Sequence, residues 1–137
     1  MIQRIQTLYL FIVIILQSIL LSTSIAKYAD PAGKETLYKT MDFPMLAALA
    51  SFTALIPAIS MFLYKNRILQ MRFNIFNSIL LVALQGFIVY YILQVRVPGF
   101  IFTIQSIFPV IALILSILAI RNILKDELLI KSLNRLR

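Results

Sequence analysis

Four long apolar runs without charged residues alternate with charged segments along the chain. The runs cover residues 8–26, 44–64, 73–95 and 100–120, and every Lys, Arg, Asp and Glu lies outside them. An α-helix rises about 1.5 Å per residue, so each run is long enough to cross the roughly 30 Å hydrocarbon core of a bilayer. The pattern predicts an all-α fold: one integral membrane domain over residues 1–137, with four transmembrane helices arranged as two hairpins.

The composition supports a membrane protein. The chain is 61% hydrophobic and 13% charged, with a mean hydropathy of +0.95, whereas soluble domains carry about 25% charged residues. The net charge of +8 would suggest nucleic acid in a soluble protein. Here the cations flank the spans, so they indicate the lipid bilayer and no nucleic acid.

The first run also resembles the apolar core of a secretory signal peptide. Ser24, Ile25 and Ala26 form a small-x-small sequence of the kind that signal peptidase cleaves. Gln17, however, is polar for the core of a signal peptide. We therefore favour a retained transmembrane helix over residues 8–26.

The distribution of Lys and Arg predicts the orientation of the spans. Most of the 13 cations lie in the N-terminal segment, in residues 65–72 and in the tail, residues 121–137. Cytoplasmic loops are enriched in Lys and Arg. We therefore expect both termini and residues 65–72 to be cytoplasmic.

Two sets of side chains repeat at helical spacing within the spans. Small residues suited to close helix packing are Ala47, Ser51, Ala54, Ala58, Ala112, Ser116 and Ala119. Intramembrane polar residues are Gln17, Asn77, Gln85 and Gln105. We interpret the amides as hydrogen-bonding groups inside a tight bundle; the alternative is a polar pathway or ligand pocket lined by them.

The tail is charged yet still apolar, and it contains no Pro or Gly. Leu129, Leu133 and Leu136 recur at helical spacing, which predicts an amphipathic helical extension of the fourth span. Its cations are expected to contact the lipid surface or a partner protein: Arg121, Lys125, Lys131, Arg135 and Arg137.

The sequence lacks most of the residue types that membrane enzymes and proton-coupled transporters use for their chemistry. Cys and His are both absent, so we expect no disulfide, no metal site, no cofactor and no enzymatic activity. The segment 27–42 is the longest polar loop between spans, with room for one short helix. Its acids, Asp30, Glu35 and Asp42, would have to converge if the protein were an enzyme acting on lipid-linked substrates.

Both ends of the chain resemble a known family. The opening Met1-Ile2-Gln3-Arg4-Ile5-Gln6-Thr7-Leu8-Tyr9-Leu10, the tail residues Lys125-Asp126-Glu127-Leu128-Leu129 and the closing Arg-Leu-Arg are similar to small four-span proteins of Bacteroidetes-type bacteria, domain-of-unknown-function family 4293. Asn134 stands where the family pattern has an acid. The resemblance implies a four-helix protein of the bacterial inner membrane and no particular activity.

Three functions fit these observations. The first is a non-enzymatic accessory, assembly or scaffold subunit of a larger membrane complex or homo-oligomer. The second is a small oligomeric transporter or channel lined by the Gln and Asn side chains. The third is the membrane enzyme, and we favour the first.

Overall fold

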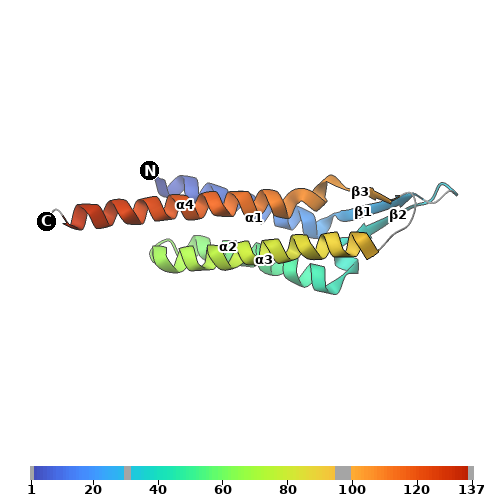
Figure 1. The fold of residues 1–137 in the computed structure, drawn as a ribbon, viewed down its shortest axis with the longest axis horizontal. Coiled ribbons are helices and arrows are strands. Elements are labelled where there is room, and N and C mark those ends of the chain that lie inside the picture. Colours follow the sequence, from blue (N-terminus) through green and yellow to red (C-terminus); the bar gives the residue numbers. More distant parts are fainter. Residues whose placement is uncertain (1, 30–31, 95–99, 136–137) are drawn as a thin grey trace.

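Four helices lie side by side along the long axis of the molecule, and a small sheet extends from one end (Figure 1). The computed structural model describes residues 2–29, 32–94 and 100–135, with side chains described for 5–28, 32–94 and 101–133. The elements in chain order are α1 (Ile2–Ser22), β1 (Ser24–Ala29), β2 (Glu35–Lys39), the 3-10 helix η1 (Thr40–Asp42), α2 (Pro44–Phe62), α3 (Arg67–Gln94), β3 (Phe100–Phe102), the 3-10 helix η2 (Ile104–Ile107) and α4 (Phe108–Arg135). The predicted all-α four-helix bundle is confirmed, and all four helices are long and apolar enough to cross a membrane.

The helices form a ring in chain order. Helix α1 packs against α2 and α4, and α3 packs against the same two neighbours. The start of α1, the end of α4 and the α2–α3 connection lie at one end of the bundle, while the sheet lies at the other (Figure 1). We call these the termini end and the sheet end.

Two of the predicted spans extend beyond their helices at the sheet end. Helix α1 stops at Ser22 and α4 begins only at Phe108, so both apolar runs, 8–26 and 100–120, contain a strand as well as a helix. The loop 27–42, where we expected at most a short helix, instead forms most of a β-hairpin followed by η1. Of the turn predicted at residues 30–33, Asp30 and Pro31 lie outside the described residues; Gly33 has φ +79°, a conformation that glycine adopts without steric cost.

The three strands form an antiparallel sheet in the order β2-β1-β3. Ala26 in the central strand pairs with Tyr38 on one side and Phe102 on the other. Two hydroxyls attach this sheet to the bundle: Thr40 Oγ1 donates to the Leu20 carbonyl at 2.5 Å, and Ser106 Oγ donates to the Ile25 carbonyl at 2.6 Å. The sheet is therefore held against the helices by hydrogen bonds as well as by its chain connections.

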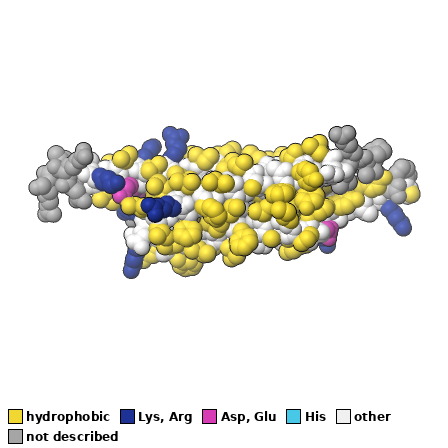
Figure 2. Space-filling model, turned by 60° about the horizontal axis from the view of Figure 1, so that its bottom comes forward, with side chains coloured by type: hydrophobic (Ala, Val, Ile, Leu, Met, Phe, Trp, Pro, Cys, Tyr) yellow, Lys and Arg dark blue, Asp and Glu magenta, His cyan; other side chains and the backbone are white. Residues whose placement is uncertain are grey.

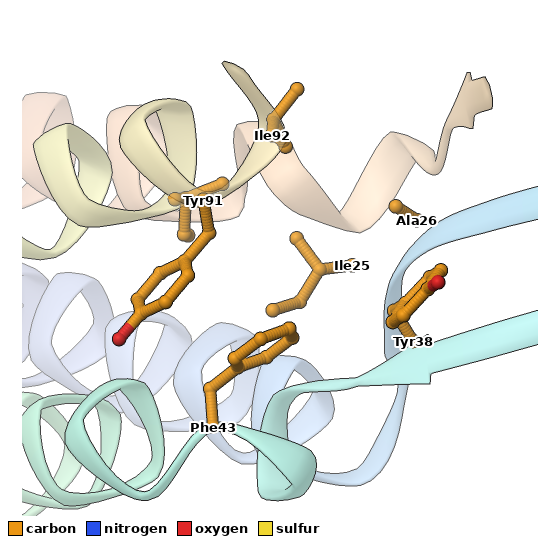
Figure 3. A pocket seen from close by; sticks show the side chains of 7 residues that line it. Ile25, Ala26, Tyr38, Phe43, Tyr91 and Ile92 are labelled. Carbon is orange, nitrogen blue, oxygen red and sulfur yellow. The ribbon is translucent and has the colours of Figure 1, made fainter. Parts of the chain in front are cut away.

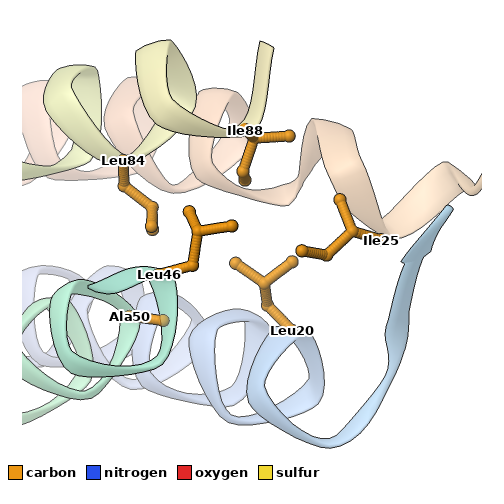
Figure 4. Close-up of a cluster of buried hydrophobic side chains, with 6 residues drawn as sticks. All are labelled: Leu20, Ile25, Leu46, Ala50, Leu84 and Ile88. Carbon is orange, nitrogen blue, oxygen red and sulfur yellow. The ribbon is translucent and has the colours of Figure 1, made fainter. Parts of the chain in front are cut away.

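A cluster of buried apolar side chains holds the sheet end together (Figure 4). It joins α1, β1, α2 and α3 through Leu20, Ile25, Leu46, Ala50, Leu84 and Ile88. A second cluster nearer the middle joins α1, α3 and α4 through Val13, Leu81 and Ala112. The apolar core therefore links helices that are far apart in sequence.

The helical extension of the fourth span is confirmed. Helix α4 continues without interruption through 28 residues to Arg135. Asp126, which we expected in an extension beyond the membrane, is only 7% exposed, and its Oδ2 accepts a hydrogen bond from Gln6 Nε2 at 2.8 Å. The first turns of the tail therefore pack against α1, while Leu128, Leu129 and Leu133 farther along are exposed.

Candidate functional site

The interior of the bundle contains a set of uncharged polar side chains. Gln17 of α1, Thr53 of α2, Asn77 of α3 and Ser116 of α4 are all fully buried. Thr53 Oγ1 lies 3.3 Å from Gln17 Oε1 and donates a hydrogen bond to it, which joins α1 to α2. Every helix thus contributes at least one polar group to the interior.

A second polar contact joins α2 to α3 nearer the termini end. Asn74 Nδ2 donates to Ser60 Oγ at 3.1 Å, and Ser60 Oγ in turn donates to the Gln70 carbonyl at 3.5 Å. Asn74 and Ser60 are fully buried, and Gln70 is 4% exposed. This network fixes the start of α3 against the end of α2.

The four intramembrane amides predicted as a group do not share one environment. Gln17 and Asn77 are fully buried, while Gln85 and Gln105 are half-buried, and Gln105 belongs to η2 rather than to α4. Each of the four has a buried side-chain atom without a hydrogen-bond partner in the described part of the protein. In Asn77 both Nδ2 and Oδ1 are buried without a partner among the described residues.

The small residues of α4 and α2 differ in their burial. Ala112, Ser116 and Ala119 of α4 are fully buried. On α2 the predicted stripe, Ala47, Ser51, Ala54 and Ala58, is only half-buried. The buried line is Leu46, Ala50, Thr53, Pro57 and Ser60.

The buried line of α2 is one residue out of step with the predicted stripe. This rotation brings the hydroxyls of Thr53 and Ser60 to Gln17 and Asn74, as the hydrogen bonds above require. Neither hydroxyl was among the residues predicted from the sequence. Their spacing of seven residues, which places them on one helix face with Ala50 and Pro57, was the available signal.

The acids of the sheet end do not converge where the structure describes them. Glu35 begins β2, and Asp42 follows the other end of that strand. Asp42 Oδ2 accepts a hydrogen bond from the Lys39 backbone N–H at 2.8 Å, which stabilises the turn of η1. Asp30 lies outside the described residues.

Aromatic rings surround a small apolar hollow between the sheet and α3 (Figure 3). Phe43 lies between Tyr91 and Tyr38, with ring centroids 4.6 and 6.4 Å away, respectively. The hollow itself has a volume of about 20 Å³, which is about the space that one water molecule needs. It is a packing defect at the junction between the sheet and the bundle rather than a ligand-binding cavity.

Three of the five predicted surface cations have described side chains, and all three lie on α4. Arg121, Lys125 and Lys131 are exposed, and Lys131 Nζ is 3.6 Å from Glu127 Oε1, one helical turn away. The side chains of Arg135 and Arg137 lie outside the described part.

A protein-family model with the description "Domain of unknown function (DUF4293)" matches residues 2–136. No curated protein and no solved structure matches the chain.

Proposed function

The chain belongs to the DUF4293 family, and on that premise we propose that it is a non-enzymatic accessory, assembly or scaffold subunit of a membrane complex. The family description states no activity, and the proposal is supported by this chain's own geometry. The protein is multi-pass, with four helices long and apolar enough to cross a membrane.

The observation that carries the proposal is that polar side chains form hydrogen bonds between neighbouring helices. The bond between Thr53 and Gln17 joins α1 to α2, the bond between Asn74 and Ser60 joins α2 to α3, and Gln6 joins α1 to Asp126 of α4. Such bonds between helices stabilise a bundle in lipid, where unpaired polar groups are costly. These hydrogen bonds hold the four helices in a fixed arrangement, which is what a scaffold or an assembly subunit requires.

The lateral surface supports contact with other membrane helices. Figure 2 shows a broad apolar surface along the middle of the molecule, with Lys and Arg mainly at the termini end. On α3 a shallow apolar groove of about 330 Å³ runs over Ala83, Gly86, Phe87 and Tyr90. A Cβ added at Gly86 would meet nothing within 4 Å, and small residues let helix backbones approach closely.

Crosslinking from the lateral surface tests this proposal. A photo-crosslinking amino acid at Gly86, in the native membrane, should capture one discrete partner protein. The same amino acid at Phe52, which is 58% exposed on α2, is the matched control and should give mainly lipid adducts. Lipid adducts alone from both sites, with no stoichiometric partner after purification in mild detergent, would count against a subunit.

We further propose that the protein lies in a bacterial inner membrane with its termini end in the cytoplasm. The bias of Lys and Arg toward that end supports this orientation. The chain contains no Cys, so single cysteines give clean reporters at Ala32 and Asn66, both exposed and at opposite ends of the molecule. An impermeant thiol reagent added to intact spheroplasts should label Ala32→Cys and leave Asn66→Cys unlabelled; the reverse pattern would refute the orientation.

A small oligomeric transporter or channel is the second candidate. The fully buried Asn77, whose amide atoms are unpartnered in the described part of the chain, favours it, because such a group gains from water or a polar solute. Gln17, Asn77 and Ser116 are inaccessible in the single chain, so this function requires the bundle to open. Solute flux in proteoliposomes that Asn77→Leu abolishes would favour the transporter over the scaffold.

A further inference from the structure

A basic hollow lies at the termini end, and we propose that it binds the phosphate headgroup of an anionic phospholipid. The hollow has a volume of about 360 Å³ and is lined by residues 65–69, Arg72 and Glu127. Its floor comes from the α2–α3 connection and the first turns of α3, and Glu127 of α4 lies on the other side. This proposal concerns a lipid site and does not depend on the scaffold role.

The charges around the basic hollow suit an anion. Lys65, Arg67 and Arg72 line it, and within the described residues no ion pair involves any of the three. The acid in the lining, Glu127, forms an ion pair with Lys131 at 3.6 Å, so its charge is partly compensated from outside the hollow. Two guanidinium groups and an ammonium group provide both bidentate and point-charge contacts to a phosphate.

The backbone adds to this positive field. Helix α3 begins at Arg67 and is 28 residues long, so its first turn lines the hollow with the positive end of a long helix. The first N–H groups of a helix have no acceptor within it and are suited to binding phosphate oxygens. The Asn66 carbonyl accepts the Gln70 N–H at 3.0 Å, which fixes the entry into the helix.

The site is held in place before any ligand arrives. Just below it, buried Ser60 contacts both the Asn74 side chain and the Gln70 carbonyl. These bonds join the last turn of α2 to the first turns of α3, the segment that carries the cations. A rigid frame lowers the entropic cost of binding.

The surroundings favour a lipid over a soluble phosphate compound. Ile68 and Leu69 in the lining are 53% and 39% exposed, and Phe62 at the end of α2 is 84% exposed. The hollow thus lies where the apolar surface of the bundle meets its charged end, which is where lipid headgroups are expected. A phospholipid can place its phosphate among the cations and its acyl chains along the apolar rim, and a soluble phosphate can use only the first of these.

Native mass spectrometry of the purified full-length protein tests the lipid site. With phosphatidylglycerol and phosphatidylcholine supplied in equal amounts, we expect the wild type to retain one phosphatidylglycerol in preference. Each Lys or Arg that contacts the bound headgroup should contribute a factor of about five to affinity. The pair Arg67→Gln and Arg72→Gln should therefore weaken phosphatidylglycerol binding by about tenfold or more, and Lys65→Gln alone by about threefold to fivefold.

The matched control removes the same charge elsewhere. Arg121→Gln with Lys125→Gln removes the same charge from two exposed cations of α4 that do not line the hollow. This pair should weaken binding clearly less than the Arg67 and Arg72 pair, because its side chains can attract the headgroup only diffusely. Equal losses in both pairs would mean diffuse attraction and would overturn the site. If the Arg67 and Arg72 pair fails to fold, Lys65→Gln decides, because that residue is exposed and outside both helices. Full displacement of the lipid by millimolar inorganic phosphate would also overturn the proposal, since it would identify a soluble phosphate site.

Discussion

Replacing Ala50 by Leu should destabilise the bundle by about 1–3 kcal/mol, the usual cost of inserting methylene groups into a packed core. Ala50 is fully buried in the cluster with Leu46 and Leu84, on the face by which α2 packs against its neighbours. A longer side chain there has to push α2 away from α3. Thermal unfolding followed by circular dichroism in a mild detergent measures the effect.

The same replacement on the other faces of α2 provides the controls. Ala48 is exposed, and Ala54 of the predicted stripe is half-buried. We expect Ala48→Leu to stay within about 0.5 kcal/mol of the wild type, as exposed substitutions usually do, and Ala54→Leu to fall between the two. If Ala54→Leu costs more than Ala50→Leu, helix α2 is turned as the sequence pattern suggested and the packing described above is wrong.

The helices could be predicted from sequence because their signal is local. Four uncharged apolar runs, each long enough to cross a bilayer, correctly indicate α1 to α4. The sheet could not be predicted in this way. Its strands at Ser24–Ala29 and Phe100–Phe102 are extensions of apolar runs, and their pairing depends on a contact between distant parts of the chain.

The orientation of α2 about its own axis was also beyond the pattern, although the small residues of α4 are buried as the pattern suggested. On α2 the predicted residues Ser51 and Ala54 each lie one position after the buried residues Ala50 and Thr53, a rotation of about 100°. Since lipid-facing and buried positions can both be apolar in a membrane protein, hydropathy does not separate them. The hydrogen bond from Thr53 to Gln17 fixes the rotation, and it is visible only in three dimensions.

The sequence predicts which segments carry the charged residues, but it does not predict how deeply each of these residues is buried. The cations of residues 65–72 were expected at a helix end and lie there, and the hollow that they line also includes Glu127 of α4. Asp126 was expected in an extension beyond the membrane and is instead buried against α1. Helix α4 carries both acids because it continues to Arg135, past the end of its apolar run.

Loss of the Gln6 side-chain amide should therefore destabilise the bundle strongly. In Gln6→Leu the buried Asp126 carboxylate loses the donor that lies 2.8 Å from its Oδ2. Hydrogen bonds to charged groups contribute about 1.5–3 kcal/mol, and an uncompensated buried charge can cost about 3–5 kcal/mol. We expect a destabilisation of about 2–4 kcal/mol and earlier separation of α4 from α1 on heating.

A double-mutant cycle isolates this contact. Asp126→Asn removes the charge while keeping the shape, so Gln6→Leu should cost at least about 1 kcal/mol less in that background, because a neutral amide is cheaper to leave unpaired than a carboxylate. Gln94→Leu is the control: Gln94 is exposed, and within the described residues its Nε2 donates to the nearby Tyr90 Oη at 2.9 Å, so this change should alter stability by less than about 0.5 kcal/mol. Additive effects of Gln6→Leu and Asp126→Asn would show that the two side chains are energetically independent. In that case the tail would be held to α1 by its apolar residues, with Ile123, only 1% exposed, as the next position to test.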